Sequence, residues 1–162
     1  MSHVNWDEYF MAVAILASKR SKDPSTQVGA VIVTPDKRII STGWNGMPHS
    51  IFPVNDVCFP WGKDSENCLE NKYMYVVHAE PNAIFHASES VRGCTMYLTW
   101  FPCHECAKSI AQSGISNLVY LKENATDRYK TSMEAAKKIF RVSGVKFTEY
   151  SSNKDDILIK FE

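Results

Sequence analysis

The chain has 162 residues, 44% of them hydrophobic, and its 18 acidic side chains balance its 18 basic ones. This length supports one well-filled core and is too short for two ordinary domains, so we expect residues 1–162 to form a single domain. Proteins that hold RNA or DNA need a basic track for the phosphates. A chain of zero net charge without a long basic stretch is therefore not expected to have a nucleic-acid partner.

The sequence also lacks the signals of secretion and membrane insertion. Its N-terminus has no apolar signal-peptide core, and no uninterrupted apolar run is long enough to cross a bilayer. Its five cysteines do not have the pattern of a disulfide framework. We therefore predict a cytoplasmic protein without a membrane partner.

The first half of the chain predicts a helix, a hairpin and a long irregular region. Residues 26–34 and 38–42 are predicted strands, and the turn at residues 35–37 joins them as a hairpin. Residues 43–75 have no clear period, and we interpret them as a binding loop or lid, because long insertions in a compact domain are more often functional than accidental. The helix that precedes the hairpin is predicted from apolar residues at helical spacing, namely Trp6, Tyr9, Phe10, Val13, Leu16 and Ala17.

The second half alternates between helices and strands. Pro81 suits the first turn of a helix in which Ile84 and Phe85 are core candidates, and a second helix over residues 103–113 should stop at Gly114. The remaining predicted elements are strands at 95–99, 117–121 and 145–150 and a helix at 133–141. A hairpin followed by this alternation predicts an α/β domain with a mixed five-stranded sheet covered on both faces, a three-layer α/β/α arrangement.

One pair of motifs carries the chemistry: His78-Ala79-Glu80, and Pro102-Cys103-His104-Glu105-Cys106. A structural zinc is closed by four protein ligands, whereas His78, Cys103 and Cys106 supply three and leave a position for water. Glu80 is then available to move protons. The spacing H-x-E followed by P-C-x-x-C is typical of zinc-dependent nucleobase deaminases, in which the glutamate is a general acid and base.

Each half of this pattern is ambiguous when taken alone. A C-x2-C pair also occurs in redox proteins, in zinc ribbons and by chance. A dithiol or a closed zinc knuckle accounts for neither His78 nor Glu80, so the two halves together favour a catalytic Zn²⁺ over a structural metal or no metal. A second zinc at His49, Cys58 and Cys68 is disfavoured by their irregular spacing.

Four further segments match a known family, and through them the chain resembles the cytidine and deoxycytidylate deaminase family over nearly its whole length. These segments are Ser21-Lys22-Asp23-Pro24 with Gln27-Val28-Gly29-Ala30, Gly43-Trp44-Asn45-Gly46-Met47-Pro48, residues 78–84, and Phe101-Pro102-Cys103 continuing to Lys108. The resemblance implies a cytidine-deaminase-like fold and the zinc-dependent hydrolysis of dCMP to dUMP and ammonia, which supplies dUMP for thymidylate synthesis. It also implies a homo-oligomer, commonly a hexamer, that is activated by dCTP with Mg²⁺ and inhibited by dTTP.

The resemblance also suggests roles for single residues. Asn45 is expected to orient the deoxyribose or the base. The Ala79 backbone and the strand end at Thr99, Trp100 and Phe101 are expected to form the base pocket, with ordinary core packing the main role of the last two. No residue is assigned to the substrate phosphate, because the family pattern does not extend into the last third of the chain. The triphosphate effector is expected at two loops, through Lys22, Asp23, Gln27, Trp44, Asn45 and Gly46.

The sequence leaves three alternative functions open. A dual dCMP and dCTP deaminase and, more remotely, a tRNA adenosine deaminase are the enzymatic alternatives. A zinc-stabilised nucleotide sensor is the non-enzymatic one. Glu80 argues against the sensor, because a binding protein has no use for a carboxylate beside an open metal site.

Overall fold

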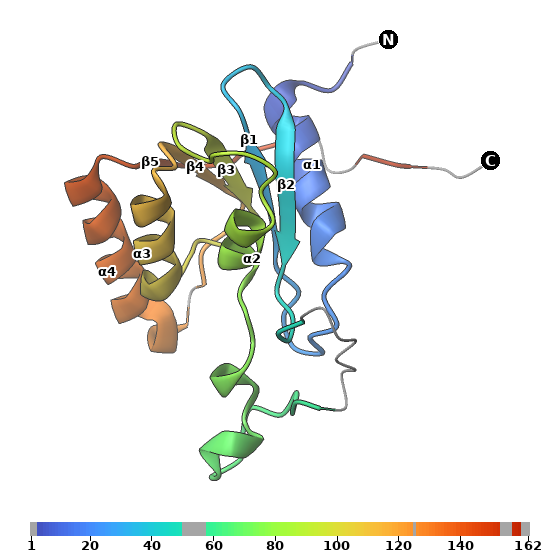
Figure 1. The fold of residues 1–162 in the computed structure, drawn as a ribbon, viewed down its shortest axis with the longest axis vertical. Helices are drawn as coiled ribbons and strands as arrows, with labels where there is room; N and C mark the ends of the chain where they lie inside the picture. The colour runs from blue at the N-terminus through green and yellow to red at the C-terminus, as the bar shows by residue number, and fades with distance from the viewer. Residues whose placement is uncertain (1–2, 50–57, 125, 153–156, 160–162) are drawn as a thin grey trace.

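The protein is described by a computed structural model, which covers residues 3–49, 58–124, 126–152 and 157–159 and contains a sheet with helices on both faces (Figure 1). Part of the expected binding loop, residues 50–57, lies outside these ranges. The helices are α1 (Trp6–Ser18), α2 (Ala79–Phe85), α3 (His104–Ser113) and α4 (Asp127–Ser143), with the short 3₁₀ helices η1 (Cys68–Glu70) and η2 (Lys72–Met74). The strands are β1 (Gly29–Val33), β2 (Ile39–Trp44), β3 (Thr95–Leu98), β4 (Asn117–Tyr120) and β5 (Lys146–Glu149).

The five strands form one sheet in the order β2-β1-β3-β4-β5. Strand β1 pairs antiparallel with β2 and β3, whereas β3, β4 and β5 are parallel, which confirms the predicted mixed sheet. The register places the start of β1 opposite the ends of its neighbours, since Gly29 pairs with Trp44 and Ala30 with Leu98. The ends of β2, β3 and β4 therefore meet at one edge of the sheet, the kind of edge at which open α/β sheets bind ligands.

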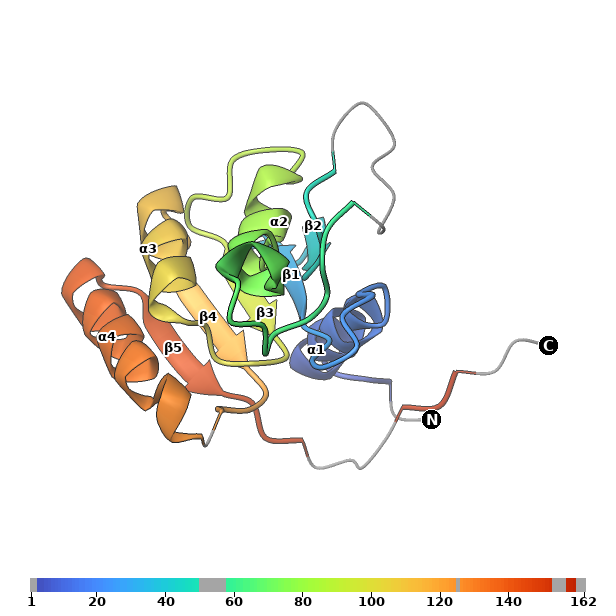
Figure 2. The same cartoon turned by 90° about the horizontal axis from the view of Figure 1, so that it is seen from below.

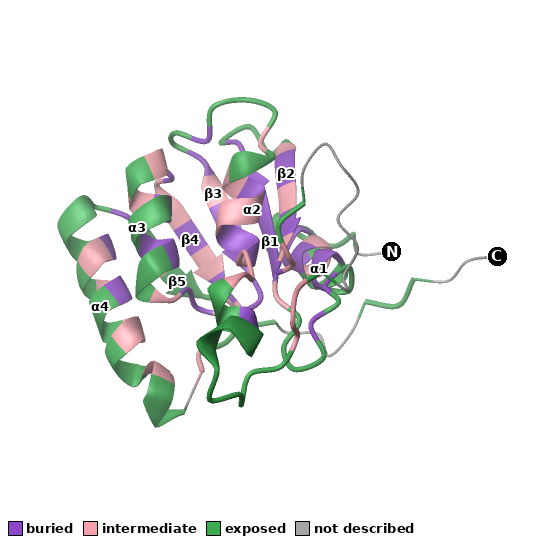
Figure 3. Ribbon diagram, turned by 60° about the horizontal axis from the view of Figure 1, so that its bottom comes forward, coloured by how far each residue is buried: buried purple, intermediate pink, exposed green. Residues whose placement is uncertain are grey.

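Two hydrophobic clusters lie on opposite faces of the sheet, as the alternation of side chains along a strand requires. Ala30 and Ile32 of β1 face the cluster that contains α2, α3 and α4, while Val31 and Val33 face α1. Figure 2 shows α1 on one side of the sheet and the other three helices on the opposite side. Buried residues concentrate on the strands and on the inward sides of the helices, which confirms the three layers (Figure 3).

The inward face of α1 differs in part from the predicted one. Phe10 and Ala17 are buried as expected, but Leu16 is 59% exposed, and Trp6 and Tyr9 are also exposed. In the part of the chain that the structure describes, α1 is the one helix on this face of the sheet, and only a narrow stripe of it reaches the strands. That stripe consists of Phe10, Met11, Ala14 and Ala17.

Other differences from the predicted elements also have local causes. Phe85 was expected in the core and is 75% exposed, because it ends α2, whereas Ile84 packs against the core.

Strand β1 begins at Gly29 and not at residue 26, since the Thr26 and Val28 amides donate to side-chain oxygens and not to a neighbouring strand. Helix α4 begins six residues before the predicted position 133, at Asp127. Gly114 ends α3 in the left-handed conformation, as predicted.

Two glycines allow helices to lie directly on the sheet. A Cβ atom at Gly29 would overlap the Ala14 carbonyl of α1, and one at Gly43 would overlap the Ala79 carbonyl and lie 2.5 Å from the Ala83 nitrogen. Helix α2 is therefore positioned by its close approach to β2. In the described ranges, no helix is long and apolar enough to cross a membrane.

We predict that Gly43→Ala lowers the free energy of unfolding by about 3 kcal/mol, the upper part of the usual range for overpacking, because the new methyl group meets backbone atoms that cannot move independently. Chemical denaturation measures this change. Gly62→Ala is the matched control, since its Cβ would meet its nearest neighbour, the Glu70 carbonyl, only at 3.5 Å. Equal stability of the two variants would contradict the close packing of α2 on β2.

Candidate active site

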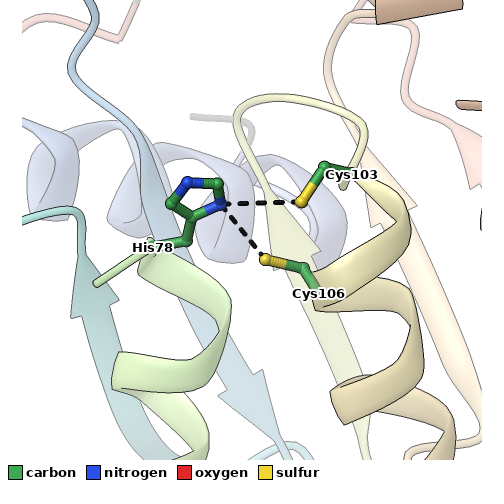
Figure 4. Close-up of side chains that lie close together, drawn as sticks. All are labelled: His78, Cys103 and Cys106. Atoms are coloured by element: carbon green, nitrogen blue, oxygen red, sulfur yellow. Dashed lines mark hydrogen bonds between the residues drawn. The ribbon is translucent and has the colours of Figure 1, made fainter. Parts of the chain in front are cut away.

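The two chemical motifs lie at the entrances of two neighbouring helices. His78 is the N-cap of α2, and the bridge between Gly46 and Val77 ties the preceding residue to the end of β2. Cys103 is the N-cap of α3, and Cys106 lies in the first turn of the same helix. The three side chains point toward one another from these two helix entrances (Figure 4).

The geometry of this group fits a tetrahedral zinc ion. The Nδ1 atom of His78 lies 3.3 Å from the sulfur of Cys106 and 3.7 Å from that of Cys103, and all three donor atoms lie within 4.8 Å of one another. Zinc bonds to nitrogen and sulfur of about 2.0–2.3 Å place tetrahedral ligands about 3.3–3.8 Å apart. One nitrogen and two sulfurs are also a donor set that zinc prefers. The three residues can therefore hold zinc and leave a fourth position open.

The charges in this group are strongly coupled. The pKa of Cys103 is lowered to about 4, because hydrogen bonds from Cys106 and His78 outweigh the effect of burial, which raises it. The pKa of His78 is raised to about 9, chiefly by its hydrogen bond to Cys103. The pKa of Cys106 is raised by the bond to Cys103 and by burial. A divalent cation competes with these protons for the same atoms, so its binding should weaken as the pH falls.

Glu80 lies in the first turn of α2, beside the group of three but not part of it. Its side chain is buried, and burial is the main cause that raises its pKa above the usual value. A carboxyl group with a raised pKa exchanges protons closer to neutral pH, which suits a general acid and base.

Asn45 is buried and fully engaged with the chain around it. Its Oδ1 accepts a hydrogen bond from the Val28 amide at 2.8 Å, and its Nδ2 donates to the Thr26 carbonyl at 2.9 Å and to Asp23 at 3.2 Å. The side chain therefore fixes two loops against each other at the edge of the sheet. Any contact with a ligand would come in addition to this structural role.

We call His78, Cys103 and Cys106 the metal group. A cavity of about 310 Å³, the metal cavity, lies beside it and is lined by His78, Glu80 and Cys103. Of the residues expected around the base, Asn45, Ala79, Trp100 and Phe101 also line it. Thr99 is not among the lining residues. Its hydroxyl accepts a hydrogen bond from the Gly29 amide at 3.1 Å, so it joins β1 to the end of β3.

The two aromatic residues at the end of β3 have different surroundings. Phe101 is buried and packs edge-on against Tyr120, Phe140 and Phe147, as expected for a core residue. Trp100 is only half-buried, and the Lys122 ammonium group lies 4.1 Å from its ring centroid. Trp100 thus keeps part of its ring accessible from the cavity.

Several lining residues were not predicted from the sequence. Arg128, Tyr129 and Met133 come from the start of α4, which no motif marked. The remaining ones come from the loop before β1, from the segment between β2 and α2 and from the loop before α4, and they are Ser25, Thr26, Val28, Lys63, Lys72, Tyr73, Val76, Asn124 and Thr126. Only a count of basic residues in these segments could have suggested Lys63, Lys72 and Arg128.

A second cavity of about 470 Å³ shares Asn45 with the first, since this residue lines both. The structure brings four of the six expected effector residues to it, namely Lys22, Trp44, Asn45 and Gly46, together with Arg20, His49, Trp61, Asn82 and His86. The other two lie elsewhere. Asp23 lines the metal cavity and is paired with Lys72, and the Gln27 amide donates to the Ser21 carbonyl at 2.7 Å.

The three-layer fold, the His/Cys/Cys group at two helix entrances and the adjacent buried glutamate define the class of zinc-dependent hydrolytic deaminases. The profile of the family described as "Cytidine and deoxycytidylate deaminase zinc-binding region" matches residues 4–122. The chain belongs to this family.

Similar proteins are known from several organisms. Deoxycytidylate deaminase of Mus musculus is 44% identical over 161 residues, which cover 99% of this chain and 88% of the relative. The Homo sapiens protein of the same name is 44% identical over 163 residues, with the same coverage of 99% and 88%. Among solved structures, the dCMP deaminase of cyanophage S-TIM5 in complex with dCMP and dUMP is 30% identical, with a TM-score of 0.68, and the match covers 91% of this chain and 100% of that one.

We predict that Cys103→Ala loses bound zinc, because two remaining protein ligands hold the ion far more weakly than three. The thermal unfolding temperature of the zinc-loaded protein should fall with the metal content, since the ion no longer stabilises the folded state. Elemental analysis and a thermal scan measure both effects. Cys68→Ala is the control, because Cys68 is exposed and should leave the metal content unchanged. Full zinc content in Cys103→Ala would refute the assignment.

Proposed function

We propose that the protein hydrolyses dCMP to dUMP and ammonia, with Zn²⁺ held by His78, Cys103 and Cys106. The observation that carries this proposal is a buried carboxyl group of raised pKa, Glu80, next to a donor set that leaves one zinc position open. The likeness to proteins named deoxycytidylate deaminase supports the choice of substrate. The dUMP formed would supply thymidylate synthesis.

Glu80 carries the protons in the proposed reaction. The zinc ion, when bound, supplies Lewis acidity that lowers the pKa of a water molecule toward neutrality. Glu80 accepts a proton from the attacking water and delivers it to N3 of the cytosine, which makes C4 more electrophilic. It then takes the second proton from the hydroxyl group now on C4 and passes it to the amino group, so that the C4–N bond breaks, ammonia leaves and the oxygen remains as the C4 carbonyl. The carboxylate ends with its starting charge.

The cavity offers separate surfaces for the parts of the nucleotide. The backbone at Ala79 and the half-buried ring of Trp100 are proposed to hold the base, while Asn45 keeps the adjoining loops in place for the sugar. Arg128 and Lys63 are proposed to bind the phosphate, because they are the lining cations that do not belong to a buried ion pair among the described residues. A guanidinium group suits a phosphate dianion, since it offers paired donors.

A panel of substrates tests this proposal. Ammonia release should be fastest from dCMP and much slower from deoxycytidine, which lacks the phosphate, with dCTP and CMP as further comparisons. Equal rates with dCMP and dCTP would instead identify a dual deaminase. Absence of ammonia release from dCMP by the zinc-loaded protein would refute the proposed function.

We predict that Glu80→Gln lowers kcat for dCMP about a hundred- to ten-thousand-fold, the usual contribution of general acid and base catalysis. The amide keeps the size of the side chain but cannot accept and return a proton. Zinc content and thermal stability should remain close to those of the parent protein, which separates this variant from Cys103→Ala. A loss of zinc in Glu80→Gln would mean that Glu80 supports the metal and does not move protons.

We further propose that the second cavity is the effector site, where dCTP with Mg²⁺ activates and dTTP inhibits. Two cations, Arg20 and Lys22, line this cavity and suit a triphosphate, and the Arg20 guanidinium carbon lies 5.8 Å from the Trp44 ring centroid. Asn45 borders both cavities and supplies a physical route between them.

We also propose a homo-oligomer, up to a hexamer, in which the exposed apolar residues of α1 are covered.

We predict that the rate with dCMP is sigmoidal, becomes hyperbolic with dCTP and Mg²⁺, and is suppressed by dTTP. The double substitution of Arg20 and Lys22 by Gln should raise the concentration of each effector that gives half its effect by about tenfold or more, because it removes two charge-assisted contacts to phosphate. Steady-state kinetics measure this. Rates indifferent to both nucleotides would contradict the effector site, and an unaltered response of the variant would move it elsewhere.

A further inference from the structure

A buried ion pair lies in the wall of the metal cavity and has no part in the proposed proton transfers. The Lys72 ammonium nitrogen lies 2.8 Å from Oδ1 and 2.6 Å from Oδ2 of Asp23. The two side chains are only 5% and 4% exposed. Both residues line the cavity that contains His78 and Glu80.

Asp23 is held in place by more than the lysine. Its Oδ1 also accepts hydrogen bonds from the backbone amides of Ser25 at 2.8 Å and Thr26 at 3.2 Å. Its Oδ2 accepts one from the side-chain Nδ2 of Asn45. Burial acts to raise its pKa, but the bonds from Lys72 and from the two backbone amides prevail and lower it. The carboxyl group is therefore ionised at neutral pH, at a fixed place in the cavity wall.

Lys72 comes from the irregular region, far from Asp23 in the sequence. It lies in η2, and the residue that follows it, Tyr73, also lines the cavity. The Arg128 guanidinium carbon lies 4.9 Å from the centroid of the Tyr73 ring. The ion pair is thus in the same wall as Arg128, which we assigned to the phosphate. Asp23 therefore places a negative charge in the wall of the same cavity as Arg128.

We propose that Lys72 determines the specificity of the cavity for anionic nucleotides by neutralising Asp23. This inference rests on the proposed function, since it concerns how the same cavity accepts a phosphate. Lys72 is a positioning residue in this proposal, because it acts through Asp23 and does not contact the substrate.

The balance of charge in the cavity supports this role. The lining cations Lys63, Lys72 and Arg128 outnumber the lining carboxylates Asp23 and Glu80 by one formal charge. Loss of Lys72 would remove that excess and leave a buried carboxylate without its partner. At an effective dielectric constant of about 20, one unit charge changes the binding of a monoanion about tenfold at a separation of about 12 Å. The charge of Asp23 therefore influences a phosphate without touching it.

The test compares an anionic ligand with an uncharged one in matched variants. We would measure KM and kcat for dCMP, and the dissociation constants of dUMP and deoxyuridine by calorimetry, on the zinc-loaded protein. The variants are Lys72→Met, which leaves Asp23 unpaired, and the double variant Asp23→Asn with Lys72→Met, which removes both charges. Arg38→Met is the control, since it removes a cation from an exposed ion pair with Glu89.

In Lys72→Met we expect KM for dCMP and the dissociation constant of dUMP to rise about tenfold or more. The dissociation constant of deoxyuridine should change less than about twofold, since an uncharged ligand does not respond to Asp23. The double variant should return the dUMP value to within about threefold of the parent protein, because the cavity regains its excess positive charge. Arg38→Met should match the parent throughout.

Three results would overturn the inference. Equal losses for dUMP and deoxyuridine in Lys72→Met would show a structural role only. If Lys72→Met does not fold, the double variant decides alone, and a tenfold weaker binding of dUMP there would mean that Lys72 contacts the phosphate itself. A parent protein that binds dUMP no better than deoxyuridine would also overturn it.

By contrast, a parent protein that binds dUMP well yet releases no ammonia from dCMP would refute the proposed function and leave this inference testable by calorimetry.

Discussion

The meeting of two helix entrances at one edge of the sheet is the constraint on which the rest of this structure depends. His78 caps α2 and Cys103 caps α3, so the metal group exists only while both helices keep their positions on the strands. The close contact of α2 with Gly43 and the burial of α3 against the same face supply that rigidity. Helix N-termini also favour negative sulfur ligands, so the backbone contributes to the chemistry as well as to the geometry.

Features that are local in the sequence could be predicted, and features that depend on tertiary contacts could not. The metal group and Glu80 lie within two short motifs, and the alternation of strands and helices is visible in the pattern of apolar residues. Arg128 and Lys72 reach the cavity only because α4 and η2 fold back toward the same edge. No spacing rule connects them to His78, so their place in the cavity became visible only with the structure.

The errors in the predicted elements have the same origin. Helical periodicity identified α1 but could not say how much of its apolar surface the sheet would cover, and Leu16 lies outside that contact. The residues before β1 are rich in strand-forming types, yet their amides bond to Asp23 and Asn45. Strand propensity was overridden there by two side-chain hydrogen bonds, one to Asp23 three residues before Thr26 and one to Asn45, which follows β2.

Asn45 and Asp23 connect the two cavities through hydrogen bonds. Asn45 borders both cavities, its amide bonds to Asp23, and its own carbonyl accepts a hydrogen bond from the Ser21 hydroxyl at 2.8 Å. A ligand in the second cavity that moves Asn45 must therefore also disturb the carboxylate that Lys72 neutralises. An effector can shift a conformational equilibrium only if it binds one of the two conformations more tightly than the other. The two conformations would differ in the position of the Asp23 carboxylate. On this argument, regulation would act mainly on the affinity for the phosphate of the substrate and less on the proton transfers by Glu80.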